Sequence, residues 1–156
     1  MSNPIDMAVR AVVVLSVLGA VTVAAAQGAA DVISARQQGF KKMGAAFKSI
    51  HKELSGPSPD AAKIAAAAAD IKAGTAVMGG WFPPGSGPEA GVKTQAKAEI
   101  WTDAKGFAAT REAFVRQVEK STRQFADPRD SAVWKDSSAA LGQACKDCHD
   151  SYRVKG

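Results

Sequence analysis

The chain has few of the residues on which many small folds depend. Aromatic residues make up only 6% of its 156 residues, and it contains two cysteines and two histidines. Two cysteines cannot build the disulfide framework of a small exported domain, and a bridge between Cys145 and Cys148 would close too small a loop to stabilise much. No stretch alternates apolar with polar residues as a half-buried strand does. These absences argue against disulfide-rich and β-sheet folds.

The longest apolar run lies near the N-terminus, over residues 11–23 (AVVVLSVLGAVTV). It follows Arg10 and leads into small residues of the kind at which signal peptides are cut. The alternative is a membrane anchor, but this run is shorter than the roughly 20 apolar residues that span a bilayer, and Gln27 soon follows it. We therefore predict that residues 1–26 are a cleaved secretory signal peptide and that residues 27–156 form a periplasmic protein without a membrane anchor.

The positive charge is modest and spread along the sequence. The formal net charge is +5, which favours acidic partners. Because the lysines are scattered rather than clustered, and because export removes the chain from the cytoplasm, we expect no nucleic-acid binding.

Apolar residues recur with helical periodicity over four segments. The first, residues 31–54, has a seam of the kind that lines helix bundles, on which Arg36 is the one charged residue. The other segments are residues 59–78, 94–125 and 129–153. Four amphipathic helices with short connections predict an all-α fold, an antiparallel up-down-up-down four-helix bundle.

Local signals predict where these helices begin and end. Ser58 is a suitable N-cap with Pro59 at the first helical position, and two glycines end that helix after Met78. Asp127 is expected to cap the fourth helix after the chain breaks at Pro128. The connection over residues 81–91 is rich in proline and glycine but also holds aromatic residues, so we expect it to be structured.

The motif that carries chemistry is C-K-D-C-H, from Cys145 to His149. C-x-x-C-H is the attachment signature of c-type haem. On a helix, two thiols three residues apart lie on one face, so Cys145 and Cys148 can both bond to the vinyl groups at one edge of the porphyrin. His149 can then turn its imidazole under the ring and ligate the iron. We predict one covalently bound haem c.

Three other uses of the motif compete with haem. A zinc site normally needs four ligands, and besides the motif the chain offers only His51. A thioredoxin-like redox pair needs a strand and helix setting, which the sequence does not predict. The third alternative is a buried structural pair of cysteines. The helical, exported context favours haem.

The occupant of the second axial position decides what such a protein does. In the common small cytochromes a methionine follows the attachment motif, but no methionine follows His149 here. Met43, Met78 and His51 remain as upstream candidates. A seam methionine such as Met43 is more often a packing residue, and His51 lies off the seam. A six-coordinate, low-spin electron-transfer cytochrome with Met43 as sixth ligand remains the alternative.

The sequence resembles cytochrome c′, the class II c-type cytochromes. The resemblance rests on C-K-D-C-H-D-S-Y-R near the C-terminus, on A-R-Q-Q-G-F-K-K-M-G in the first helix, on W-F-P from Trp81, and on K-T-Q-A-K-A-E-I-W from Lys93. It implies that Phe40 faces the distal side of the haem, where low-spin relatives place a ligating methionine. Because a phenyl ring cannot ligate, the resemblance implies five-coordinate, high-spin iron, with Phe40 and Met43 walling an apolar pocket.

The resemblance also assigns roles to polar residues. It implies that Arg36 and Gln37 lie against the haem propionates, with Thr94 and Gln95 nearby, whereas a snorkelling surface arginine is the alternative for Arg36. It places Arg153 beside the proximal face. It further implies a homodimer through the first two helices, although the sequence leaves a monomer open.

An open, apolar distal side implies a particular ligand chemistry. It offers bound O₂ no hydrogen bond, which favours NO and CO. The resemblance therefore implies a periplasmic haem protein that binds small diatomics, with electron transfer to an unidentified periplasmic redox partner as a second role. A peroxidase would need a distal acid–base residue, so we expect no enzymatic activity.

The attachment motif makes a direct prediction about mass. Protein purified from the export compartment should begin near Gln27 and carry one haem adduct that denaturation does not remove, and Cys145→Ala with Cys148→Ala should lose it. Intact-mass spectrometry under denaturing conditions checks this. A wild-type mass without the adduct would contradict the haem assignment.

Overall fold

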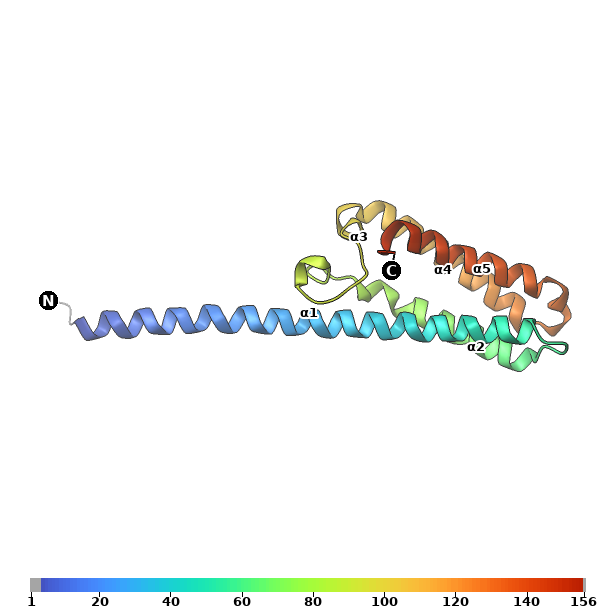
Figure 1. Ribbon diagram of the computed structural model, residues 1–156, viewed down its shortest axis with the longest axis horizontal. Helices are drawn as coiled ribbons and strands as arrows, with labels where there is room; N and C mark the ends of the chain where they lie inside the picture. The colour runs from blue at the N-terminus through green and yellow to red at the C-terminus, as the bar shows by residue number, and fades with distance from the viewer. Residues whose placement is uncertain (1–3, 156) are drawn as a thin grey trace.

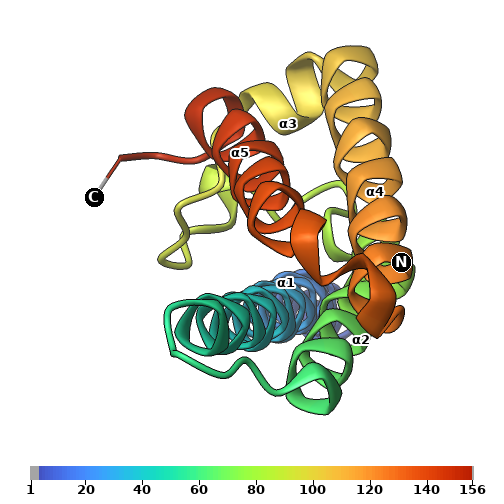
Figure 2. The same cartoon turned by 90° about the vertical axis from the view of Figure 1, so that its right-hand side faces the viewer.

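The computed structural model describes the backbone of residues 4–155 and the side chains of residues 28–129 and 131–155. Its four long helices form an antiparallel bundle (Figures 1 and 2): α1 (Pro4–Leu54), α2 (Ala61–Val77), α4 (Ala104–Ala126) and α5 (Trp134–Tyr152). Short helices lie in the connections: η1 (Met78–Trp81), η2 (Pro88–Ala90), α3 (Glu99–Thr102) and η3 (Pro128–Val133). Consecutive long helices pack on each other and α5 returns to α1, so the predicted four-helix bundle is confirmed.

The predicted signal peptide, residues 1–26, lies outside the residues whose side chains are described, so its cleavage stays a prediction. Among the described residues, no helix combines the length and apolar character needed to cross a membrane.

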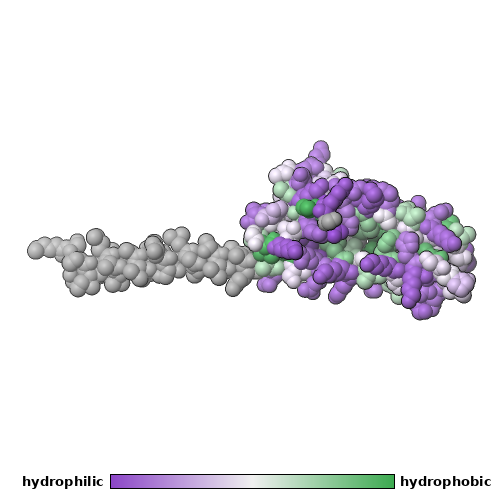
Figure 3. Space-filling view, viewed as in Figure 1, coloured by the Kyte–Doolittle hydropathy of each residue, from purple (hydrophilic) through white to green (hydrophobic). Residues whose placement is uncertain are grey.

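The predicted apolar seams face the interior and form the core. The buried seam residues are Ile33, Met43, Ile50, Leu54, Ile64, Ala68, Ile71, Met78, Ile100, Phe107, Phe114, Val118, Trp134, Leu141 and Tyr152. Hydrophilic residues cover much of the face drawn in Figure 3, as an amphipathic bundle requires.

The apolar residues form a main cluster and a smaller one. The main cluster fills the bundle between α1, α2, α4 and α5. The smaller cluster consists of Ile100, Phe107 and Tyr152 and lies where α3, α4 and the end of α5 meet. Phe82 borders both clusters, so the connection after α2 joins them.

The start of α2 differs from the prediction. Asp60, not Ser58, is the N-cap, and its Oδ1 accepts hydrogen bonds from the backbone N–H groups of Ala62 and Lys63 at 3.0 and 3.2 Å. A carboxylate also interacts favourably with the positive end of the helix dipole, which explains why Asp60 takes this position.

The predicted third helix is divided, and its first five residues are not helical. Residues 94–98 run along the end of α5, where Ala96 pairs with Arg153 in an isolated antiparallel bridge. Helix then begins at Glu99 as α3, and Asp103 starts α4 by accepting a hydrogen bond from the Gly106 N–H at 3.1 Å. Pairing with α5 thus overrides the helical propensity of this segment.

The fourth segment begins with a tighter turn than predicted. Asp127 caps it as expected, accepting a hydrogen bond from the Arg129 N–H at 3.0 Å. Residues 128–133 form a 3₁₀ helix, and α5 itself starts at Trp134.

Only a residue without a side chain fits at position 39 of α1, where Gly39 lies directly against Trp81. A Cβ placed there would overlap the six-membered ring of Trp81, whereas a Cβ on Gly44 of the same helix would meet nothing within 4 Å. Trp81 also packs edge-on against Phe40, with ring centroids 5.0 Å apart. The glycine therefore determines how η1 lies against α1.

These two glycines give a matched test of the packing. Gly39→Ala should lower the free energy of unfolding by about 1–3 kcal/mol, because Trp81 must move in a packed region. Gly44→Ala should raise it by up to about 1 kcal/mol through helix propensity. Chemical denaturation of the two variants measures both effects, and equal stabilities would contradict the packing argument.

Candidate haem site

The two cysteines lie on the last turns of α5, on the face turned toward the apolar interior. Both are free thiols and half-buried. Cys145 packs against the main cluster and Cys148 against the smaller one. The residues between them, Lys146 and Asp147, are exposed. A group bonded to both sulfurs therefore meets apolar side chains of both clusters, as the hydrophobic porphyrin requires.

The environment of the thiols favours their neutral form. Burial, with a smaller contribution from Cys148, raises the pKa of the Cys145 thiol to about 11, and burial also raises the pKa of Cys148. Thioredoxin-type attack uses the thiolate, which this environment disfavours. Among the described residues no group of three or more histidine, cysteine or acidic side chains is placed to hold a metal ion. The structure thus favours neither the zinc site nor the redox pair.

His149 follows the cysteines and is exposed near the end of α5. Partial desolvation of the ring lowers the pKa of its imidazole, and the positive charge of Arg153 lowers this pKa further. The neutral imidazole that results at neutral pH is the form that ligates iron.

A short bridge fixes the end of α5 immediately after His149. The Lys97 N–H donates to the Tyr152 carbonyl at 3.1 Å, and the Val154 N–H donates to the Gln95 carbonyl at 2.8 Å. The Lys97 ammonium also donates to two carbonyls in the last turn of the helix, which would otherwise be unsatisfied. Sequence reasoning missed this role of Lys97, because its partners are 53 and 54 residues away.

Tyr152 ties the same end of α5 to the start of α4. Its hydroxyl donates to Asp103 Oδ2 at 3.0 Å, and its ring packs edge-on against Phe107 at 5.2 Å. Burial, then the hydrogen bond to Asp103, raises the pKa of the Tyr152 phenol. The helix that carries the attachment motif is therefore anchored on two sides.

Arg36 is buried, so the alternative of a snorkelling surface arginine is wrong. Its side chain is 3% exposed. Nη1 donates to the Trp81 carbonyl and Ser86 Oγ at 3.1 and 3.2 Å, and Nη2 donates to the Ser86 carbonyl and Thr94 Oγ1 at 3.0 and 2.9 Å. Its guanidinium also lies 4.9 Å from the centroid of Phe82. Burial lowers the pKa of this guanidinium, and the charge of Glu89 opposes that shift.

The other polar residues predicted to face the propionates lie along the same connection. Gln37 donates to the Lys93 carbonyl at 3.0 Å, and Thr94 bonds to Arg36. Gln95 accepts a hydrogen bond from Arg153 Nε at 2.9 Å. The structure thus groups Arg36, Gln37 and Thr94, and it turns Gln95 toward the segment after His149. Sequence reasoning missed Ser86, whose only signal was its place in a loop rich in proline and glycine.

The residues predicted to wall the distal pocket have different surroundings. Phe40 is half-buried beside the main cluster, which Cys145 also borders, and contacts Trp81 and Phe82. Met43 is 7% exposed and points at α2, since its Sδ lies 2.6 Å from where a Cβ of Gly74 would be. Met43 thus packs between α1 and α2.

The other candidates for a sixth ligand also have packing or surface roles. Met78 is buried in the main cluster. His51 is exposed, as expected, and its ring packs edge-on against Phe47 at 5.2 Å.

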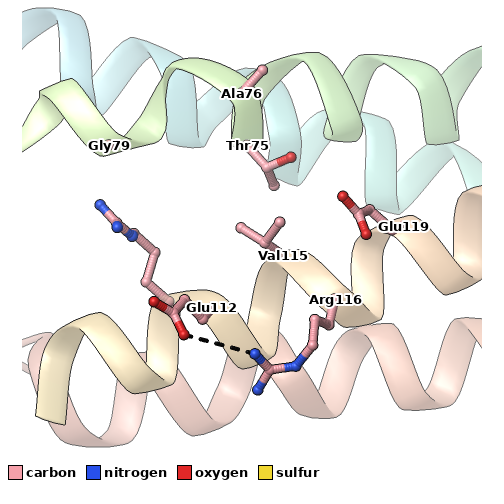
Figure 4. Close-up of a pocket in the computed structure, with 8 residues that line it drawn as sticks. Thr75, Ala76, Gly79, Glu112, Val115, Arg116 and Glu119 are labelled. Atoms are coloured by element: carbon pink, nitrogen blue, oxygen red, sulfur yellow. Dashed lines mark ion pairs between the residues drawn. The ribbon is translucent and has the colours of Figure 1, made fainter.

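A separate groove of about 450 Å³ lies between α2 and α4 (Figure 4). Arg116 and Glu112 form an ion pair of 3.8 Å at its edge. It is lined by Thr75, Ala76, Gly79, Arg111, Glu112, Val115, Arg116 and Glu119. None of the predicted site residues lies in it, so this groove is not the haem site.

Two half-buried thiols and a histidine in a C-x-x-C-H motif on the last helix of a four-helix bundle define a c-type haem protein of the bundle class. Comparison with known proteins agrees. The sequence pattern of the cytochrome c′ family matches residues 31–153. The chain is 34% identical over 152 residues to cytochrome c′ of Cereibacter sphaeroides, covering 94% of this chain and 99% of that one. It is 32% identical to cytochrome c′ of Alcaligenes xylosoxydans xylosoxydans, covering 80% and 94%.

Solved structures give the same result. A cytochrome c′ with ligand-controlled dimer dissociation superposes with a TM-score of 0.75 at 29% identity, covering 81% of this chain and 97% of that one. A ferrous variant of cytochrome c′ from Alcaligenes xylosoxidans with bound NO gives a TM-score of 0.71 at 30% identity, covering 81% and 95%. The chain therefore belongs to the cytochrome c′ family, whose members bind haem c.

The acceptors around Arg36 can be tested through stability. Ser86→Ala and Thr94→Val each remove a hydrogen bond to a buried cation and should lower the free energy of unfolding by about 1–3 kcal/mol, whereas Thr94→Ser should retain most of it. Ser34→Ala on the exposed side of α1 is the control and should change stability by less than about 0.5 kcal/mol. Urea denaturation of the haem-loaded protein measures all four. A Ser86→Ala effect no larger than the control would contradict the role of Ser86.

Proposed function

We propose that this protein is a periplasmic haem protein that binds NO and CO at a five-coordinate, high-spin iron. One haem c is held by thioether bonds at Cys145 and Cys148, with His149 as its single axial ligand. Transfer of electrons to a periplasmic redox partner is a second role. The haem supplies the iron that binds the diatomic and changes oxidation state.

The proposal rests on what Phe40 and Met43 contact. Phe40 packs against aromatic rings, and Met43 packs against α2. Phe40 has no group that can ligate iron, and its ring is held by Trp81 at 5.0 Å and Phe82 at 6.3 Å. Met43, the ligand in the alternative, has its sulfur against Gly74 of α2. Ligation by Met43 would therefore require that its contact with α2 be broken.

The polar groups near this end of α1 support the preference for NO and CO. Arg36 donates four hydrogen bonds to acceptors within residues 81–94. The N–H groups that make these bonds are therefore not free to bind a diatomic ligand. Phe40 itself packs against the main apolar cluster and contacts the rings of Trp81 and Phe82. Such a site gives bound O₂ no hydrogen bond and offers no acid–base group for peroxide cleavage, so we propose a binding rather than a catalytic role.

The family relatives support the choice of ligand and assembly. One solved relative has NO bound to its ferrous form, and another is a dimer whose dissociation is controlled by a ligand. We propose that this chain also forms a homodimer, through the outer faces of α1 and α2, where Val77 is 58% exposed.

Spectroscopy of two variants tests the coordination state. The wild-type ferric and ferrous proteins should give high-spin absorption and EPR spectra, and the ferrous form should bind CO and NO. Phe40→Met should convert the resting iron to a low-spin, six-coordinate form, because it adds a sulfur ligand at the distal position. Met43→Leu is the matched control and should leave the spin state unchanged.

The opposite pattern would contradict the proposal. A low-spin wild-type spectrum that becomes high-spin in Met43→Leu would establish the electron-transfer cytochrome with Met43 as sixth ligand.

A further inference from the structure

Cations that are scattered in the sequence come together beside the attachment motif. The bridge between Ala96 and Arg153 joins two segments that are more than 50 residues apart. We call the surface formed by Lys93, Lys97, Arg153 and Lys155 the basic ridge. In Figure 1 the C-terminus lies at the end of the bundle where the connection between α2 and α4 runs.

Hydrogen bonds to neutral groups hold two cations of the basic ridge in place. Lys97 Nζ donates to the carbonyls of Asp150 and Ser151 at 3.0 and 3.1 Å, and Arg153 Nε donates to the Gln95 side-chain carbonyl at 2.9 Å. Neutral acceptors fix the position of a cation without cancelling its charge.

Little negative charge compensates the basic ridge. Within residues 28–129 and 131–155, none of the ion pairs involves one of its four cations. The carboxylate of Asp150 interacts electrostatically with Lys155, but its ion pair is with Lys146. Lys93, Arg153 and Lys155 are exposed, so a local positive potential faces solvent.

An apolar residue lies within this charged surface. Val154 is 49% exposed and stands between Arg153 and Lys155. Protein–protein interfaces have a similar composition, with apolar residues at the centre and polar residues around them. Transient complexes of electron-transfer proteins use small interfaces of this kind.

The basic ridge also lies next to the iron-binding motif. The Arg153 N–H donates to the His149 carbonyl at 3.1 Å, and Ala96 and Cys148 both pack against the smaller apolar cluster. A partner seated on the ridge would therefore stand near Cys148, the residue to which one edge of the porphyrin would be bonded.

We propose that the basic ridge is the docking surface for a one-electron redox protein with an acidic face. Opposite charge steers such a partner to the surface and sets its orientation. This inference rests on the proposed function in one respect, because it requires bound haem that changes oxidation state.

Charge reversal on the basic ridge tests the proposal. The ferric, haem-loaded protein is reduced in a stopped-flow instrument by flavodoxin hydroquinone, an acidic protein donor, and separately by the cation hexaammineruthenium(II). Each gives one electron to the iron and becomes flavodoxin semiquinone or ruthenium(III). Lys93→Glu with Lys155→Glu leaves the bonded residues Lys97 and Arg153 in place.

The expected result is a change of opposite sign with the two donors. At low salt the double variant should react about tenfold more slowly with flavodoxin and faster with the ruthenium complex, and both differences should shrink as salt screens the charges. Lys120→Glu with Lys135→Glu has the same net charge change but lies on α4 and α5 toward the opposite end of the bundle. This control should change the rate with flavodoxin by less than about twofold.

Three results would overturn the proposal. Equal slowing in both double variants would mean that net charge, and not the basic ridge, steers the donor. Unchanged flavodoxin rates, together with ridge-dependent sedimentation on phosphatidylglycerol vesicles, would make the ridge a membrane-binding surface. A wild-type protein that neither donor reduces would overturn the proposed function as well, whereas the first two results leave that function intact.

Discussion

The guanidinium of Arg36 is a full positive charge held inside the protein, and much of the site is organised around it. A buried charge is costly unless it is hydrogen-bonded, and here four N–H groups find acceptors within residues 81–94. Satisfying the guanidinium therefore requires that this connection fold back over α1. That fold brings Trp81 and Phe82 onto Phe40, so one buried cation shapes the apolar surroundings of Phe40, the residue that we propose faces the distal side of the haem.

A second constraint is the way α5 ends, next to the attachment motif. The last carbonyls of a helix lack partners within the helix, and residues 95–97 supply them through the bridge to Arg153 and the ammonium of Lys97. Tyr152 adds its hydrogen bond to Asp103. These contacts limit fraying of the turn that carries Cys148 and His149, so the thiols and the imidazole of the motif are held in a fixed arrangement.

Both constraints act through the same stretch of chain. Residues 81–97 satisfy Arg36 on one side of the smaller apolar cluster and cap α5 on the other. The connection between α2 and α4 thus links the surroundings of Arg36 and Phe40 to the end of α5 that carries the attachment motif. Its lysines, Lys93 and Lys97, lie beside Arg153 and Lys155 after α5 and give the protein the charged surface that we assign to a redox partner.

Much of this could be predicted from the sequence, because helical periodicity and the attachment motif are local patterns. The seams of all four helices, the C-x-x-C-H motif and the capping role of Asp127 needed only residues within a few positions of each other. The resemblance to the family added Phe40 and Arg36. The start of α2 was predicted less accurately, because Ser58 and Asp60 are both good N-caps and only the structure shows that the Asp60 side chain bonds to the first backbone N–H groups of the helix.

Tertiary structure alone decided the contacts between segments distant in the sequence. Residues 94–98 have helical propensity but pair with the end of α5, because capping α5 outweighs the small propensity difference per residue. Met43 lies on the predicted seam, yet only the approach of Gly74 shows that its sulfur faces α2. Lysines that look scattered in the sequence gather into one surface. The sequence by itself determined the helices and the haem attachment, whereas the direction of each polar or sulfur-bearing side chain depended on partners that only folding brings near.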